Sequence, residues 1–210
     1  MQLIPKNRGF TLLEMIVSIS IFTIVALVAV GSLLKVVDAN KKAQSLKTSI
    51  NNINFALDSI SREMRVGRNY YCSPGLSFPS RAAIEALGSA GSCGPITSGS
   101  WTVAFKSSQA CLDDPKSNRI FAYQFDSSAN SGAGMLKKAE QKNCVDSPSF
   151  DPIISPDIKF NEGGVAGIRV VRSPDIQSYA QFHFRGYAGT KEKIKTYFDL
   201  QTTVSPRLTD

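Results

Sequence analysis

The feature that most constrains this chain is an uninterrupted run of 20 uncharged residues, Met15 to Leu34, close to its start. A helix of this length spans the ~30 Å hydrocarbon core of a bilayer. Two cations, Lys6 and Arg8, precede the run, and positively charged flanks stay on the cytoplasmic side. We therefore expect one membrane pass, with the N-terminus inside and everything after Leu34 outside.

A single carboxylate, Glu14, lies at the edge of the apolar run. An ionisable group there is costly and indicates a function. Glu14 follows Phe10 by four residues, so the two share one helix face, ~6 Å apart along the axis. A cut after Gly9 would give Phe10 a free α-amine, which would pair with Glu14 of a neighbouring copy. A buried ion pair of this kind fixes register between copies more than it adds stability.

The segment Gly9-Phe10-Thr11-Leu12-Leu13-Glu14, between a short basic leader and the apolar run, resembles the N-terminus of type IV prepilins and pseudopilins. In that family a membrane aspartyl protease, the prepilin peptidase, cuts after the leader glycine and methylates the new amine. The resemblance implies cleavage between Gly9 and Phe10, N-methylation of Phe10, and an assembly role for Glu14. It covers about residues 5–40, and the remainder resembles the family only in layout.

Two other interpretations of this segment are a plain signal anchor and a secretory signal cut after Gly31, because Ala29-Val30-Gly31 loosely fits a small-x-small cleavage site. On the sequence alone, neither explains Glu14. Gly31 also weakens the expected helix by ~1 kcal/mol relative to alanine. It marks either a point of local melting during assembly or a packing contact.

Downstream, seven apolar residues recur at spacings of three and four and form one stripe on a helix: Ala43, Leu46, Ile50, Ile53, Leu57, Ile60 and Met64. No proline interrupts residues 11–66, and Gly67 is a favourable residue just past a helix end, so we expect one helix of about 56 residues. A sheet of the same chain is the expected cover for the stripe, and a short coiled coil is the alternative.

Residues 68–100 are predicted to be mostly loop, with a turn at 70–75, a short helix at 80–87 capped by Ser80, and a Gly- and Ser-rich surface loop at 88–100. Strand patterns follow, at 101–106, 119–126, 135–140, 157–160, 167–172, 179–187 and 193–204. In the first of these the apolar residues Trp101, Val103 and Phe105 alternate with their neighbours, which predicts a half-buried strand.

The predicted fold class is therefore α+β. A long N-terminal helix, transmembrane in its first half and amphipathic in its second, packs on a C-terminal antiparallel β-sheet in a pilin-like layout. We expect three segments: a leader at 1–9, a transmembrane assembly segment at 10–37, and an extracytoplasmic globular domain at 38–210.

Four cysteines, Cys72, Cys93, Cys111 and Cys144, all follow the membrane segment. An even number in an exported domain favours two disulfides, for which three pairings exist. If the first three strands form a meander, the end of the first and the end of the third meet at one edge. That arrangement favours Cys111–Cys144 and leaves Cys72–Cys93. The spacings are too wide for a zinc knuckle, and we expect no metal site.

The residues needed for catalysis are not grouped in this sequence. His183 is the only histidine; it falls between Phe182 and Phe184 in a predicted strand, where we expect it to face solvent or a neighbouring strand. Asp113 and Asp114 stand side by side before Pro115, where a turn role is favoured. No Gly-rich phosphate loop follows a strand and opens a helix. We expect no enzyme activity and no cofactor. The formal charge of +7 comes from scattered cations, so nucleic-acid binding is not favoured.

These features predict a structural subunit of a type IV pilus or a type II secretion-like pseudopilus, polymerised through its N-terminal helix. The resemblance implies several partners: copies of the chain, other pilins, the prepilin peptidase, an assembly ATPase and a platform protein. It also implies a location first in the bacterial cytoplasmic membrane and then in an extracytoplasmic filament. The alternative is a membrane-anchored or filament-tip binding module, an adhesin or a DNA-uptake receptor.

Overall fold

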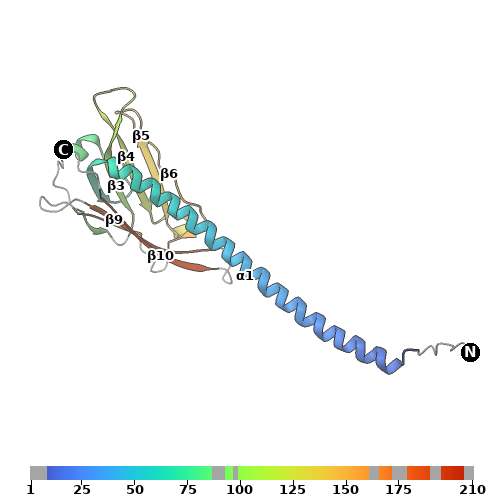
Figure 1. The fold of residues 1–210 in the computed structure, drawn as a ribbon. Helices are drawn as coiled ribbons and strands as arrows, with labels where there is room; N and C mark the ends of the chain where they lie inside the picture. The colour runs from blue at the N-terminus through green and yellow to red at the C-terminus, as the bar shows by residue number, and fades with distance from the viewer. Residues whose placement is uncertain are drawn as a thin grey trace, which may run out of the picture. The chain divides into compact units, whose positions relative to one another are not determined.

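The computed structural model describes residues 9–86, 93–96, 99–160, 166–171, 179–189 and 195–205 of the chain. The chain divides into two compact units, Met1–Ala43 and Gln44–Asp210, and each is described by itself. Helix α1, Leu12–Val66, is one continuous helix (Figure 1), and the boundary between the two units falls within it. Its 55 residues confirm the single uninterrupted helix that the sequence predicts, because no proline stands within it.

In the second unit, α1 buries one stripe of side chains. Ile53, Leu57, Ile60 and Met64, all members of the predicted stripe, are buried, and Ile50 is half-buried. The strands of the same unit cover this stripe, so a coiled coil is not what buries it. The helix ends before Gly67, where a Cβ would overlap the Phe105 ring.

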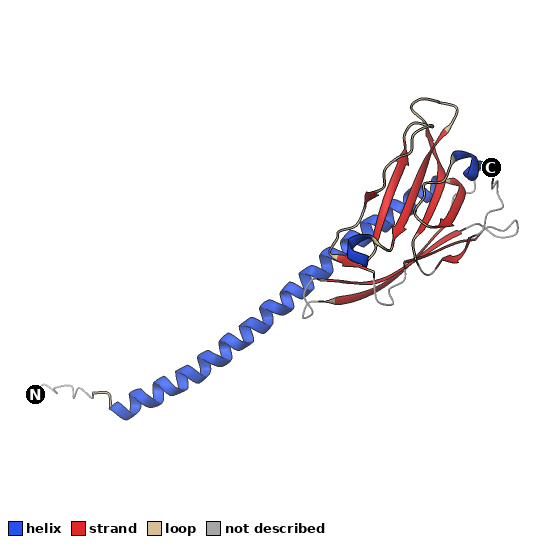
Figure 2. Cartoon of the chain, turned by 180° about the vertical axis from the view of Figure 1, so that it is seen from behind, coloured by secondary structure: helices blue, strands red, loops and turns tan. Residues whose placement is uncertain are grey.

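The described part of the second unit beyond α1 is built mainly on two antiparallel five-stranded sheets (Figure 2). The first sheet has the order β1-β3-β4-β5-β6, with β1 at Arg68–Pro74, β3 at Trp101–Ala110, β4 at Asn118–Asp126, β5 at Met135–Gln141 and β6 at Asp151–Pro152. The second has the order β10-β9-β8-β2, with β7 also paired to β9. Its strands are β2 at Cys93–Ile96, β7 at Ile158–Lys159, β8 at Ala166–Val171, β9 at Tyr179–Ala188 and β10 at Thr196–Val204.

The main core lies where the buried stripe of α1 meets both sheets. Its largest fully buried side chains are aromatic: Trp101, Phe105 and Tyr123 from the first sheet, and Phe182 and Phe184 from the second. The Trp101 ring lies 6.4 Å from the Phe182 ring, measured between centroids, so the two sheets are in direct side-chain contact. One hydrophobic core therefore serves the helix and both sheets.

A second apolar cluster covers the opposite face of the first sheet. Ala104, Ile120, Ala122 and Ala139 point to this face, and Ile84 of α2, Arg81–Ala86, packs on them. As a result residues 101–105 are buried on both faces, so the prediction of a half-buried strand there is wrong. The alternation correctly predicts a strand, but α2 covers the face of β3 that the pattern leaves to solvent.

The prediction that residues 68–100 are mostly loop is also wrong, because β1 and β2 lie within them. Both segments contain prolines, Pro74 and Pro95, that read as turn signals. Both strands lie at a sheet edge, where a missing backbone N–H breaks no ladder. The short helix predicted at 80–87 is present as α2, and its N-terminus is capped by the Ser80 hydroxyl, which accepts from Ala83 N–H at 3.2 Å.

The remaining short element, α3 at Ala129–Gly132, is a turn between β4 and β5 rather than a regular helix. Asn130 and Ser131 have positive φ angles of 56° and 58° within it. The Asp126 carboxylate accepts from the backbone N–H groups of Ser128 and Ala129, each at 3.1 Å, and fixes the turn. The β3-β4-β5 meander predicted from the strand patterns is confirmed.

Candidate functional site

The predicted processing site lies just before α1. Gly9, Phe10 and Thr11 precede the first helical residue, Leu12, and both Gly9 and Phe10 are exposed. Residues 1–8 of the leader lie outside the described part of the chain. A peptide bond that is exposed and outside regular structure suits proteolysis, and the Gly9–Phe10 bond meets both conditions.

Thr11 caps the start of α1. Its hydroxyl oxygen accepts the Glu14 backbone N–H at 3.3 Å, and its carbonyl oxygen accepts from Met15 at 3.2 Å. Thr11-Leu12-Leu13-Glu14 has the T-x-x-E spacing of a capping box. This spacing is visible in the sequence, and it gives Glu14 a second possible role beside the predicted one in assembly.

The cap gives Glu14 a local role that has to be weighed against assembly. A capping interaction is worth about 1 kcal/mol, and a carboxylate in the first turn gains about 0.3–1 kcal/mol from the helix dipole. A charge carried to the centre of a membrane helix costs about 2.5–3.5 kcal/mol. Capping therefore accounts for a carboxylate that stays near the headgroups, but not for one drawn into apolar surroundings. Among the described residues, no side chain pairs with the Glu14 carboxylate.

The first part of α1 presents apolar side chains on every face. From Leu12 to Val37 its large apolar side chains are 39–78% exposed. The hydroxyls within this segment bond to the helix itself, since Ser20 donates to Ile16 O and Thr23 to Ile19 O, each at 2.8 Å. Hydrogen bonds of this kind satisfy the hydroxyl groups, which would otherwise lack partners in an apolar environment. By length and composition, this helix can cross a membrane.

Comparison with protein families gives one match: a family described as the prokaryotic N-terminal methylation motif matches residues 4–30. This match supports the resemblance of the N-terminus to those of type IV prepilins and pseudopilins. The matched range of this pilin-like chain contains Gly9, Phe10 and Glu14 and most of the apolar run. Its α+β architecture, a long N-terminal helix followed by antiparallel sheets, is also pilin-like. No curated protein and no solved structure matches it.

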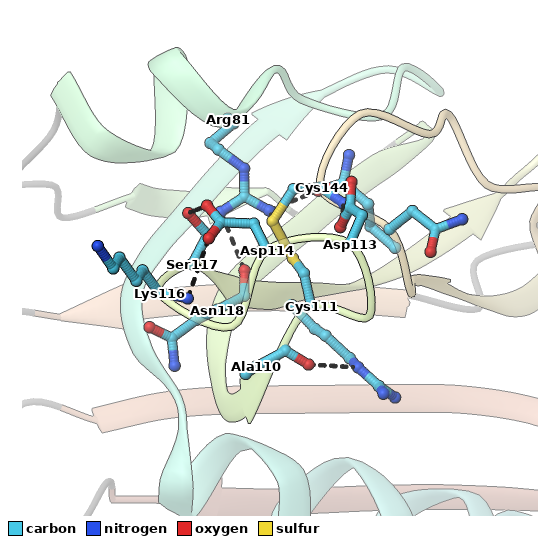
Figure 3. Close-up of a disulfide and its surroundings, with 12 residues drawn as sticks. Arg81, Ala110, Cys111, Asp113, Asp114, Lys116, Ser117, Asn118 and Cys144 are labelled. Carbon is cyan, nitrogen blue, oxygen red and sulfur yellow. Dashed lines mark hydrogen bonds between the residues drawn. A yellow bond between two sulfur atoms is a disulfide. The ribbon is translucent and has the colours of Figure 1, made fainter.

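The second unit of the pilin-like chain contains the disulfide that the meander predicts. Cys111 follows β3 and Cys144 follows β5, and their Cα atoms lie 5.7 Å apart (Figure 3). The Asp113 carboxylate accepts from Cys144 N–H at 2.8 Å, so a hydrogen bond runs beside the disulfide. Asp113 lies near both sulfurs, but sulfurs in a disulfide are not the thiolates that bind metals.

Asp114 has the turn role that the sequence predicts. Its two carboxylate oxygens accept from the Ser117 hydroxyl at 2.6 Å and from Lys116 N–H at 3.0 Å. These hydrogen bonds hold the pKa of Asp114 below its usual value, with that from Ser117 the larger cause. The carboxylate is thus committed to the loop between β3 and β4.

Arg81, the first residue of α2, is a connector that sequence reasoning missed. Its guanidinium donates to Asn118 O at 2.9 Å and to Gln141 Oε1 at 3.0 Å, and lies 3.5 Å from Cys111 Sγ (Figure 3). It therefore holds α2 against the disulfide-bonded end of the first sheet. No local pattern distinguishes it from an ordinary surface arginine.

The other predicted pairing, Cys72–Cys93, lies outside what the structure describes. Cys72 is disulfide-bonded, and the side chain of Cys93 is not among the described ones. Cys93 itself belongs to β2, which pairs with β8.

Glu63 links α1 to the first sheet, a role that no pattern in the sequence predicts. One carboxylate oxygen accepts the Tyr123 hydroxyl at 2.6 Å, and the other pairs with the Lys138 ammonium. Burial raises the pKa of Tyr123, and the hydrogen bond and charge of Glu63 raise it further. The Lys138 ammonium also lies 4.8 Å from the centre of the Phe121 ring.

His183 lies on the outer face of the second sheet, where the sequence predicts that it faces solvent or a neighbouring strand. Its Nε2 is 2.6 Å from Asp199 Oδ1 on β10, and Arg185 binds the other Asp199 oxygen at 2.8 Å. Hydrogen bonds from His183 and then Arg185 lower the pKa of Asp199. Within the described part of the chain, the hydrogen bonds of this group include no serine or cysteine nucleophile.

Proposed function

We propose that this chain is a structural subunit of a type IV pilus or a type II secretion-like pseudopilus. In this proposal the prepilin peptidase removes residues 1–9 and methylates Phe10. Residues 10–37 anchor the protein in the cytoplasmic membrane and later assemble, and residues 38–210 form the extracytoplasmic domain. The observation that carries the proposal is the methylation motif at residues 4–30, which overlaps the first part of α1, where the large apolar side chains from Leu12 to Val37 are exposed.

The apolar part of α1 needs two environments in succession. As a single subunit it is covered by lipid, and in a filament it packs against copies of itself and other pilins. The move is close to neutral in hydrophobic terms, because lipid chains are as apolar as the side chains of a neighbouring helix. Specific polar contacts must then decide register, and Glu14 paired with the Phe10 amine of a neighbour is the contact that the N-terminus offers.

No catalytic step is part of the proposal. An assembly ATPase and a platform membrane protein, implied by the family resemblance, would supply the work of extrusion. An anchored or tip-located binding module would have the same N-terminus. It differs in being a trace component of the filament rather than its bulk.

The experiment that tests the proposal combines filament purification with intact-protein mass spectrometry. Filaments sheared from the native host should contain this chain beginning at N-methylated Phe10. A Gly9→Val variant should retain the leader, stay in the membrane fraction and be absent from filaments. Gly31→Val, which changes the same residue type inside the helix, is the control and should be cut normally. A wild-type chain that retains residues 1–9, or a cut at Phe10 in Gly9→Val, would contradict the proposal.

A further inference from the structure

A pocket of about 620 Å³ lies in the second unit, where α1 ends and β1 begins. Its volume falls within the ~300–1,000 Å³ range of small-molecule sites. Three cations line it, Arg65, Arg68 and Lys106, together with the neutral polar residues Asn69 and Ser108. Among the described lining residues there is no carboxylate. The proposed filament role gives this pocket no task.

The cations of the pocket are only partly neutralised. Lys106 pairs with Glu85 of α2 at 2.7 Å, and the side chain of Glu85 is 49% exposed. Within the part of the chain that the structure describes, neither Arg65 nor Arg68 has an ion-pair or hydrogen-bond partner. Two guanidinium groups are therefore available at the pocket.

Arg68 stands opposite another cation in the first sheet. In the β1–β3 ladder Arg68 is the direct partner of Lys106, and like charges placed opposite each other destabilise a sheet. Arg65 has a local reason to be there, because a cation in the last turn of a helix interacts favourably with the helix dipole. That reason does not extend to Arg68, which is outside the helix.

The surroundings of the pocket are fixed by packing. Gly67 lies against the Phe105 ring with no room for a Cβ, and the Tyr70 hydroxyl donates to Met64 O. Met64 O also accepts from Gly67 N–H at 3.1 Å, so this carbonyl at the negative end of α1 is already bonded. Asn118, which also lines the pocket, is held by its donation to Ser107 O at 2.8 Å.

We propose that this pocket binds a phosphate monoester, with the guanidinium groups of Arg65 and Arg68 on the phosphate and the organic part in the remaining volume. Guanidinium forks match the oxygens of a phosphate in bidentate geometry. Two arginines beside a lysine suit the charge of about −1.5 to −2 on a phosphate better than the single charge of a carboxylate. The bound anion also relieves the opposition of Arg68 and Lys106.

The test is a titration of the full chain in detergent micelles with inorganic phosphate at constant ionic strength, followed by calorimetry. The wild type should bind saturably, and Arg65→Gln/Arg68→Gln should bind at least tenfold more weakly. Arg62→Gln is the matched control, because Arg62 is an exposed arginine of α1 outside this pocket and should leave binding unchanged. Equal binding by the double variant, or no saturable binding by the wild type, overturns the proposal.

Two further arms keep the result decisive if the double variant folds poorly. Arg68→Lys keeps the charge but loses the bidentate fork, so it should weaken phosphate binding several-fold. Glycerol 3-phosphate should bind at least as tightly as inorganic phosphate, and acetate should not compete at equal concentration. Full binding by Arg68→Lys, weaker binding of glycerol 3-phosphate, or competition by acetate would each contradict the assignment of a phosphate ester.

Discussion

The two parts of α1 follow different physical rules. Between Leu12 and Val37 the large apolar side chains are all exposed, whereas in the second unit Ile53, Ile60 and Met64 are at most 2% exposed. The second part satisfies its apolar stripe with its own sheets. Among the residues that the structure describes, none covers the first part, and its sequence suits surroundings that other molecules provide. One continuous helix thus contains a part that the chain's own sheets bury and a part that stays exposed in the single chain.

The largest expected difference between the two parts concerns the removal of an aromatic ring. Phe182→Ala removes a fully buried side chain from the contact between the two sheets, and should lower the free energy of unfolding by about 3–5 kcal/mol. Phe22→Ala, at a side chain that is 73% exposed, should change it by less than about 0.5 kcal/mol. The chain's one tryptophan, Trp101, lies in the core and reports denaturant unfolding in both variants. Equal losses would remove the distinction between the two parts.

Removal of the described disulfide should have the next largest effect. The Cys111–Cys144 bond closes a loop with a sequence separation of 33 residues. A disulfide that closes a loop of that size is expected to stabilise the folded state by about 3–4 kcal/mol, because it lowers the entropy of the unfolded chain. Cys111→Ser/Cys144→Ser should therefore lower the denaturation midpoint of the second unit. Membrane insertion of the first part, measured by carbonate extraction, should be unchanged, and a loss of insertion would contradict the independence of the two regions.

A smaller loss of stability is expected when the ion pair between α1 and the first sheet is removed. Glu63→Gln keeps an acceptor for the Tyr123 hydroxyl but removes the charge paired with Lys138, at a cost of about 1–2 kcal/mol. Asp58→Asn, at an exposed carboxylate on the same helix, is the control and should change stability by less than about 0.5 kcal/mol. Urea titration of both variants measures their free energies of unfolding. An unchanged value for Glu63→Gln would show that this ion pair does not stabilise the packing of α1 on the first sheet.

The pH dependence of stability gives the smallest of these effects. The pKa of Tyr123 is raised in the folded protein, so the unfolded chain loses this proton first as the pH rises. The contribution of the protonated Tyr123 hydroxyl to the free energy of unfolding is fully present below pH ~10, the ordinary tyrosine pKa. This contribution is lost as the pH rises above that value. Tyr123→Phe should flatten this decline relative to the wild type. Tyr197→Phe, at a side chain that is 74% exposed, should leave it as it was.

Much of the fold could be predicted because its signals are local. The absence of proline and the spacing of the apolar stripe gave the bounds of α1 within a residue, and Ser80 marked the start of α2. Alternation identified β3, β4 and β5, and their order led to the pairing of Cys111 with Cys144. Each of these features depends on neighbours in sequence or on consecutive strands.

The features that were missed depend on distant parts of the chain or on a misleading local signal. β1 and β2 contain Pro74 and Pro95, which look like turns until their edge positions are known. Glu63 meets its partner Lys138 across 75 residues, and Arg81 meets Gln141 across 60, so no short window reveals either contact. The cap at Thr11 is different, because the T-x-x-E spacing that predicts it is local and visible in the sequence.

The measurement that tests the account most directly compares Glu14→Gln with Thr11→Ala in filament assembly. Thr11→Ala removes the side-chain cap of α1 and keeps the carboxylate, whereas Glu14→Gln removes the negative charge and keeps the capping hydroxyl. Both variants should be cut after Gly9, as intact-mass measurement of membrane fractions will report. In sheared filaments, Thr11→Ala should be present at close to the wild-type amount and Glu14→Gln should be reduced at least tenfold. Wild-type amounts of Glu14→Gln in filaments, or equal losses for the two variants, would show that Glu14 serves the helix start and not the contact between subunits.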